Sequence, residues 1–274
     1  MVFSREMTGS RERYWELVES LIRRGIVSRQ QWFYCDRSEY GYFTKRYRGE
    51  RKLSCLFRDV RRHMFWTKCL ADYMLTGDFG YTPIEENPFY KVFARNSYDP
   101  ALVGSMLIAW ASRQSRRNTV WIRGPPNTGA PFLAEAIAYC CPLLTCVDWR
   151  NKMNPFERGF ESLLFWWDGG HVPHKSVGLC RQVFRGENVM FPREDGQMSE
   201  LVRTPVLMYS EHDVCRTMIK YGVFSDEYSE SLRNSMYCLD LSVPTEGSEC
   251  VTCGDAKEFF AWAYPRRMDF DFFK

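Results

Sequence analysis

The sequence predicts an α/β fold in which an N-terminal helical bundle precedes a domain built on a mainly parallel sheet. Up to residue 112, apolar side chains recur at three- and four-residue spacing, which is typical of helices that face a core. From residue 119 onward, short β-type runs alternate with helical stretches, and this alternation favours parallel strands joined by crossovers. A hydrophobic fraction of 45% supplies material for a packed core and excludes a disordered chain.

The helical part shows clear start and stop signals. Gly25 closes a first helix at a position that tolerates positive φ, and Ser28 with Gln31 forms a capping box that opens a second. Asp99 followed by Pro100 is an N-cap with proline at the first helical position. The predicted helices cover residues 11–25, a segment after 28, 53–75 and 99–112.

The second half carries the strand signals. The β-type runs are TVWIR, LLTCVDW, SLLFWWD, TPVLMYS and SMYCLDL at residues 119–123, 143–149, 162–168, 204–210 and 235–241. Helical stretches are expected at residues 132–140, 174–184 and 255–266. We therefore expect a basic helical bundle over 1–80, a connector with a helix over 81–112, and the sheet domain over 113–274.

The charge is unevenly distributed. Residues 1–70 carry 16 Lys/Arg against 8 Asp/Glu, although the whole chain has a net charge of only +3. The densest run, KRYRGERKLSCLFRDVRRH, interleaves basic residues with Tyr47, Phe57 and Phe65, a composition that suits nucleic acid or an acidic partner. The alternative is a solvated helix face. The candidate contacts are Lys45, Arg46, Arg48, Arg51, Lys52, Arg58, Arg61 and Arg62.

No metal site is predicted. Eleven scattered cysteines without a secretory signal are best interpreted as reduced thiols. Cys250 and Cys253 form a C-x-x-C without a second pair at zinc-site spacing, and His171 with His174 fits loop residues better than ligands.

The sequence shows no membrane or secretion signal. It has no apolar run of about 18 residues and no apolar signal region near the N-terminus. We expect a soluble intracellular protein that needs no membrane. The segment KRYRGERK is a candidate nuclear-import signal.

The run GPPNTGAP follows the first strand and resembles a phosphate-binding loop, G-x-x-x-x-G-K-[S/T]. Gly124 and Gly129 stand at the correct interval, with Asn127 and Thr128 between them, and a helix follows. Ala130 and Pro131, however, stand where the lysine and hydroxyl residue belong. Pro131 also removes a backbone N–H at the helix start.

Beyond this loop, the chain resembles the superfamily 3 helicase domain of parvovirus replication proteins, especially the Rep proteins of adeno-associated viruses. Four collinear segments carry the resemblance: YWELVESLIRRGIVSRQQWFYCD, the stretch NPFYKVFARNSYDP through GPPNTGAPFLAEAIA, CVDWRNKMNPFERGFESLLFWWDGGHV and RTPVLMYSEHDVC. The resemblance implies an AAA+-like helicase fold, a bundle that helps subunits associate, and viral DNA replication in the host nucleus. It resembles Rep-like products of larger DNA viruses such as avian adenoviruses, and we expect no nicking domain.

Residue by residue, the resemblance implies a degenerate nucleotide site. Asp168 retains the first Walker B acid, but Gly169 replaces the glutamate that orients water. Glu211 replaces the sensor asparagine, and Ser235 stands at the arginine-finger position. Basic positions of a further family loop fall on Glu194 and Gly196, near Arg193. Arg123, Arg193 and Arg233 are the arginines that could supply a replacement charge.

These substitutions favour a pseudoenzyme with no catalytic residues and disfavour bound ATP and magnesium. Weak nucleotide binding without turnover, through the loop amides and Asp168, and a metal held by Asp168 with Glu211 stay open as alternatives. The pseudoenzyme would act by binding DNA, viral or host replication or regulatory factors, or further copies of a helicase, itself included. The alternative is a residual ATP-binding helicase in viral genome replication. A third hypothesis is a DNA-binding module without motor function.

Overall fold

The computed structural model describes residues 9–46, 50–77, 83–192, 198–245 and 251–267. Tertiary contacts divide the chain into two compact units, Met1–Lys68 and Cys69–Lys274. The boundary follows Lys68 rather than residue 80, because the helix after Cys69 packs against later helices of the second unit. None of the helices within the described ranges is long and apolar enough to cross a membrane.

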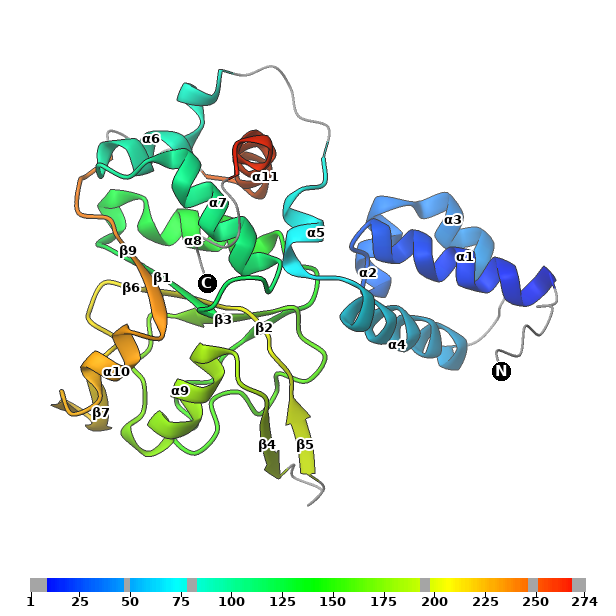
Figure 1. The fold of residues 1–274 in the computed structure, drawn as a ribbon. Helices are drawn as coiled ribbons and strands as arrows, with labels where there is room; N and C mark the ends of the chain where they lie inside the picture. Colours follow the sequence, from blue (N-terminus) through cyan, green and yellow to red (C-terminus); the bar gives the residue numbers. More distant parts are fainter. Residues whose placement is uncertain (1–8, 47–49, 78–82, 193–197, 246–250, 268–274) are drawn as a thin grey trace, which may run out of the picture. The chain divides into compact units, whose positions relative to one another are not determined.

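The first unit is a bundle of short helices. Ser28 accepts a hydrogen bond from the Gln31 amide, so the predicted cap opens the second helix. Trp32 is fully buried and stacks edge-on against Tyr40, which fixes the position of this helix. The helices are α1 (Gly9–Arg23), α2 (Arg29–Cys35), α3 (Arg37–Arg46) and α4 (Glu50–Thr67) (Figure 1).

The helix predicted over 53–75 is interrupted. Helix α4 ends at Thr67, and Cys69 adopts an extended conformation before a new helix begins at Leu70. The Asp72 carboxylate accepts a hydrogen bond from the Cys69 amide at 2.7 Å, which stabilises this restart. The helices that precede the sheet are α5 (Leu70–Met74), the short η1 (Ile84–Glu86), α6 (Pro88–Arg95) and α7 (Pro100–Ala111).

The second unit is built on a five-stranded parallel sheet in the order β2-β3-β6-β1-β9. The predicted fold class is therefore confirmed, and strands arise from all five of the β-type runs. The central positions of β1, β3 and β6 are buried, as expected for strands covered on both faces, whereas those of β2 and β9 at the sides of the sheet are partly exposed. The strands are β1 (Thr119–Arg123), β2 (Leu144–Cys146), β3 (Leu164–Asp168), β6 (Val206–Ser210) and β9 (Met236–Asp240).

Helices cover both faces of this sheet (Figure 1). Helices α7, α8 (Ala130–Tyr139) and α11 (Cys253–Ala263) pack together on one side, while α9 (Val177–Arg185) and α10 (Ser229–Arg233) lie on the other. The α9 side holds a core of large rings, among them Trp121, Trp167 and Phe184. Two buried indoles are anchored by polar contacts, since Trp121 donates to Ser210 Oγ and Trp167 donates to the Gly170 carbonyl.

Two antiparallel hairpins extend the fold and were not predicted. One pairs β4 (Val189–Pro192) with β5 (Met198–Leu201), and the other pairs β7 (Thr217–Lys220) with β8 (Val223–Ser225). Short 3₁₀ turns complete the unit at η2 (Pro126–Thr128), η3 (His174–Ser176) and η4 (Tyr264–Arg266).

Candidate functional site

The loop between β1 and α8 has a backbone that only glycine permits at two positions. Gly124 has φ +159°, and a Cβ there would lie 2.2 Å from the Leu241 carbonyl oxygen. Gly129 has φ +82° and immediately precedes α8. The strand, glycine loop and helix predicted from the sequence are therefore present, and the loop is held in one shape.

The amides of this loop are largely unavailable to a ligand. Pro125, Pro126 and Pro131 have no N–H. The Thr128 amide donates to the Pro125 carbonyl at 3.0 Å, and its hydroxyl donates to the same oxygen at 2.7 Å. The Gly129 amide donates to the Pro126 carbonyl at 3.3 Å. A phosphate cradle needs such N–H groups to point outward, whereas these point back into the loop.

The loop is also tied to the chain beyond β9. The Asn127 carbonyl accepts hydrogen bonds from the amide and the hydroxyl of Thr245, at 2.8 and 3.1 Å. Ala130 is fully buried, and Pro131 occupies the first turn of α8. The two residues that stand in place of the lysine and the hydroxyl residue are therefore part of the packed start of α8.

Parallel pairing brings Arg123 and Asp168 to one edge of the sheet, and Glu211 follows β6 at the same edge. Asp168 pairs with Tyr209, and Arg123 pairs with Ser210 on one side and Asp240 on the other. Asp168 and the next strand's Glu211 are both exposed at this edge. Burial raises the pKa of Tyr209, and the negative charges of Glu211 and Asp168 raise it further, so the edge is electronegative.

Gly169 leaves β3 with φ +64°, and no atom lies within 4 Å of the place of its missing Cβ. Its amide donates to the Tyr209 carbonyl at 2.9 Å. The next residue, Gly170, is required by packing, because a Cβ there would lie 2.1 Å from the Trp149 ring. Gly169, the residue after Asp168, therefore turns the chain away from the edge of the sheet where β3 ends.

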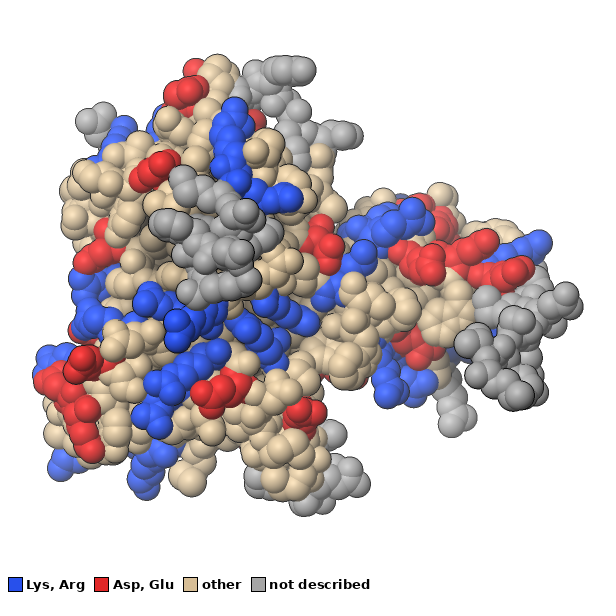
Figure 2. Space-filling view, viewed as in Figure 1, with Lys and Arg blue, Asp and Glu red and all other residues tan. Residues whose placement is uncertain are grey.

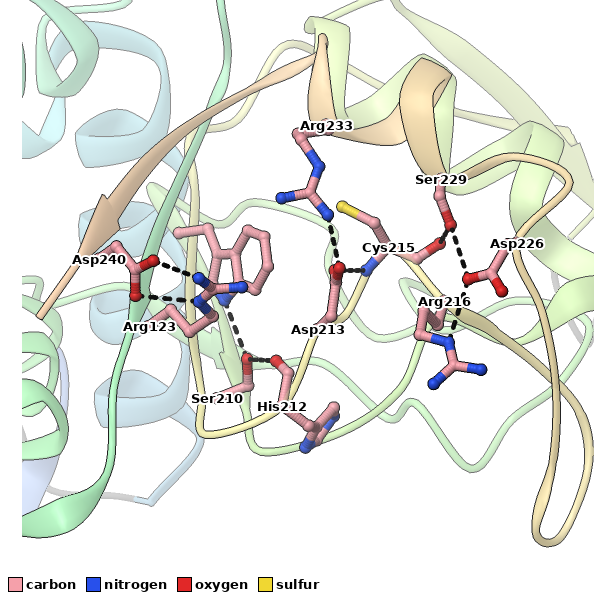
Figure 3. Close-up of polar contacts among 11 residues, drawn as sticks. Arg123, Ser210, His212, Asp213, Cys215, Arg216, Asp226, Ser229, Arg233 and Asp240 are labelled. Carbon is pink, nitrogen blue, oxygen red and sulfur yellow. Dashed lines mark hydrogen bonds and ion pairs between the residues drawn. The ribbon is translucent and has the colours of Figure 1, made fainter. Parts of the chain in front are cut away.

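The two described arginines that could replace the missing charge are both paired (Figure 3). Arg123 Nε donates to Asp240 at 3.0 Å, its NH2 group donates to the other carboxylate oxygen, and these bonds raise the pKa of Arg123. Arg233 donates to Asp213 at 2.5 Å. Arg193, Glu194 and Gly196 lie outside the described residues.

Ser235 is buried, with 3% of its surface exposed. Its hydroxyl donates to the Leu232 carbonyl at 2.6 Å, which closes the end of α10. The arginine-finger position is therefore occupied by a structural hydroxyl that does not reach the sheet edge.

Sequence reasoning did not find the partners at this edge. Asp240 and Asp213 neutralise the two arginines; Asp240 lies near the end of the last β-type run, and Asp213 stands three residues after the run at 204–210. His212 was also missed, and its ring stacks on His171 with the centroids 3.8 Å apart. Burial, with the neighbouring His212, lowers the pKa of His171 to about 4.

The described histidines and cysteines form no metal-ligand group of three or more within the residues that the structure places. His174 contacts the Thr217 hydroxyl at 3.0 Å rather than a second ligand. Cys253 lies beside Cys140, while Cys250 lies outside the described residues.

The basic candidates lie on the first unit. Arg58, Arg61 and Arg62 are exposed on α4, opposite the buried Leu56 and Val60. Lys45 and Lys52 are also exposed; Arg48 lies outside the described residues, as do the side chains of Arg46 and Arg51. Figure 2 shows acidic and basic side chains intermixed on the visible face of this unit.

The prediction that Phe57 and Phe65 could meet a ligand beside these arginines is wrong, whereas the one for Tyr47 stays a prediction. Phe57 and Phe65 are buried in the bundle, and Tyr47 lies outside the described residues. Trp66 is 67% exposed instead. It follows Arg58 and Arg62 at four-residue spacing, so helical periodicity could have identified it.

The chain matches the family described as Parvovirus non-structural protein NS1 over residues 7–273. It belongs to this family. It is 48% identical to the Uncharacterized protein ORF2 of Fowl adenovirus A serotype 1 (strain CELO / Phelps), over 94% of this chain and 95% of that protein. It is 29% identical to Protein Rep52 of Adeno-associated virus 2 (isolate Srivastava/1982), over 90% of this chain and 62% of Rep52.

A more distant relative is the Initiator protein NS1 of Human parvovirus B19 (isolate AU), 22% identical over 97% of this chain and 40% of that protein. The chain thus spans about half the length of several relatives that it matches. Among solved structures, JCV Helicase aligns at a TM-score of 0.47 and 10% identity, over 84% of this chain and 73% of that one. The predicted family resemblance is confirmed.

Proposed function

We propose that this NS1-family chain acts by binding and does not hydrolyse ATP. The observation that carries the proposal is the pairing of Arg123 with Asp240 and of Arg233 with Asp213, beside a loop without lysine. These are the described arginines nearest in sequence to the positions where phosphoryl transfer needs positive charge. Each already neutralises a carboxylate.

The magnitudes support this proposal. A charged hydrogen bond contributes about 1.5–3 kcal/mol, so loss of the loop lysine alone weakens triphosphate binding roughly 10- to 100-fold. An arginine finger contributes about 10³–10⁵ in rate. The groups act together, so the losses do not add. Loss of either the loop lysine or the arginine finger alone removes most ATP hydrolysis. The negative charges of the exposed Asp168 and Glu211 also repel a triphosphate.

We further propose that single-stranded DNA is the ligand, bound by the α4 surface, defined as Arg58, Arg61, Arg62 and Trp66. Arginine guanidinium groups contact phosphates, and an exposed indole provides a platform for stacking a base. Arg61 and Arg62 form no ion pair with any described residue. Within the described part of the chain, no carboxylate therefore neutralises their charge.

The test is fluorescence anisotropy of a labelled oligonucleotide titrated with the full chain at several salt concentrations. The variant Arg58→Ala/Arg61→Ala/Arg62→Ala should bind more weakly, and the slope of log affinity against log salt should fall by about 2, at roughly 0.7 per phosphate contact. The control Arg150→Ala/Arg158→Ala/Arg185→Ala removes the same charge from exposed positions on the other unit. Equal loss in both variants, or in neither, contradicts the α4 surface.

The second candidate function is a residual nucleotide-dependent helicase. Asp168 remains at the end of β3, and both loop glycines remain at the spacing of a phosphate-binding loop, with positive φ. Turnover that depends on Asp168 would favour this candidate. We also propose, from family membership, a location in the host nucleus and viral or host replication or regulatory proteins, or further copies of the chain, as partners. Affinity purification from infected nuclei tests both.

A further inference from the structure

Two free cysteines from distant parts of the sequence meet between α8 and α11. Cys140 follows the last residue of α8, and Cys253 is the first residue of α11. They are 113 positions apart in the sequence, and their sulfur atoms lie 3.2 Å apart. Either thiol can donate the hydrogen bond between them. No backbone rearrangement of several ångströms is needed to bring these sulfurs together.

The two thiols have different surroundings. Cys140 is 5% exposed, and its sulfur lies 3.3 Å from the Ala136 carbonyl oxygen, one turn back along α8. Cys253 is half-buried at the start of a helix, where the backbone dipole favours a negative charge. The contact with Cys140 lowers the pKa of Cys253, and the positive charge of Lys257 makes a smaller contribution in the same direction. The same contact and burial raise the pKa of Cys140.

This asymmetry assigns the two roles. Cys253 is the accessible residue and forms the thiolate. Cys140 is the buried residue beside it and stays protonated. By contrast, burial raises the pKa of both Cys141 and Cys180 to about 12, and neither is exposed. Cys35 and Cys146 are exposed, but their positions show no comparable contact with a second thiol in the described part of the chain.

We propose that Cys253 and Cys140 form a thiol–disulfide exchange site that reacts with small disulfides of the glutathione class. The Cys253 thiolate attacks one sulfur of the small disulfide, whose S–S bond breaks and releases one small thiol that takes up the Cys253 proton. Cys140 then loses its proton and attacks Cys253 Sγ, which expels the second small thiol. Two protein thiols are oxidised, and one small disulfide is reduced to two thiols.

The disulfide between Cys140 and Cys253 would join the end of α8 to the start of α11. Helix α8 begins directly after the Gly124–Gly129 loop, and α11 packs against both α7 and α8. A cross-link that closes a loop of about 100 residues restricts the unfolded chain strongly, and the expected rise in Tm is about 5–10 °C. Oxidation would therefore stabilise the helical layer that supports the loop, and reduction would release it.

The experiment treats the reduced full chain with glutathione disulfide and maps the products by peptide mass spectrometry. We expect an intramolecular disulfide joining residues 140 and 253, two glutathione molecules released per chain, and the rise in Tm. Cys140→Ser should instead retain one glutathionyl group on Cys253, whereas Cys253→Ser should leave residue 140 unmodified. The control Cys146→Ser removes an exposed thiol and should behave as the wild type.

A disulfide between Cys250 and Cys253, or modification of Cys253 no faster than that of Cys35 and Cys146, overturns the proposal. A stable glutathionyl group on Cys253 in the wild type overturns it as well, because Cys140 would then not act. These results do not depend on whether the chain binds DNA or hydrolyses ATP, so they test this site independently of the proposed function.

Discussion

Arg123 donates to both carboxylate oxygens of Asp240, and this pair spans the neighbouring strands β1 and β9. Arg123 directly precedes the first glycine of the loop, so it is the cation nearest in sequence to the place where a phosphate would bind. The strand register sets Asp240 opposite it. Because both oxygens of Asp240 accept from the Arg123 guanidinium, its charge is already neutralised by a neighbouring strand.

Replacing Asp240 by alanine should release this arginine. We expect Asp240→Ala to bind a fluorescent, non-hydrolysable ATP analogue up to about 10-fold more tightly, since one charged hydrogen bond becomes available. The free energy of unfolding should change by less than about 1 kcal/mol, because the pair is partly exposed. The control is Asp226→Ala, which removes an equal charge from the exposed Arg216 pair. Unchanged affinity for the analogue would show that Arg123 cannot reach the loop.

The loop glycine should be sensitive to a single methyl group. Gly124→Ala places a Cβ 2.2 Å from the Leu241 carbonyl, and this overpacking should lower the free energy of unfolding by about 1–3 kcal/mol. Gly169→Ala is the matched control, because it has positive φ with open space around it and should lose only about 1 kcal/mol. Urea denaturation measures both. A smaller loss for Gly124→Ala than for Gly169→Ala would contradict the described loop.

Acidification should lower the free energy of unfolding, because His171 is harder to protonate in the folded chain than in the unfolded chain. Burial and His212 hold the folded-state pKa near 4, whereas the unfolded value is 6.5. The unfolded chain therefore binds more protons between these values, so this stabilisation is complete above about pH 6.5 and is lost as the pH falls toward 4. His171→Asn should reduce the difference in unfolding free energy between pH 7.5 and pH 5. An unaltered pH difference in His171→Asn would refute this assignment.

The exposed indole on α4 should contribute to DNA affinity without contributing to stability. Trp66→Ala should weaken binding of a single-stranded oligonucleotide about 5- to 100-fold, because one stacked base contributes about 1–3 kcal/mol. Its thermal unfolding should match that of the wild type, since 67% of the side chain is exposed. Tyr34→Ala, which removes an aromatic residue that is 84% exposed on α2, should bind normally. Equal binding by Trp66→Ala and the wild type would remove Trp66 from the α4 surface.

Local chemistry explains which parts of the fold were predictable. The five β-type runs and the caps at Ser28 and Asp99 carry their own signals, and the structure confirms them. The hairpins β4–β5 and β7–β8 have weak alternation and were missed. The break between α4 and α5 was missed because apolar spacing continues across Lys68, and only Asp72 marks the restart.

The candidate site was predictable only in part. The glycine spacing and the acid at Asp168 are visible in the sequence, and parallel strands bring their ends to one edge. The pairings of Arg123 with Asp240 and Arg233 with Asp213 join residues 117 and 20 positions apart. They depend on strand order and loop path, which spacing alone does not provide. The same holds for the contact between Cys140 and Cys253.

The most direct test of the account is phosphate release from radiolabelled ATP by the purified full chain, with and without single-stranded DNA. The account predicts release no faster than in a protein-free blank under both conditions, and the same result for Asp168→Ala. Release that exceeds the blank and disappears in Asp168→Ala would show that the site still hydrolyses nucleotide, and would contradict the account.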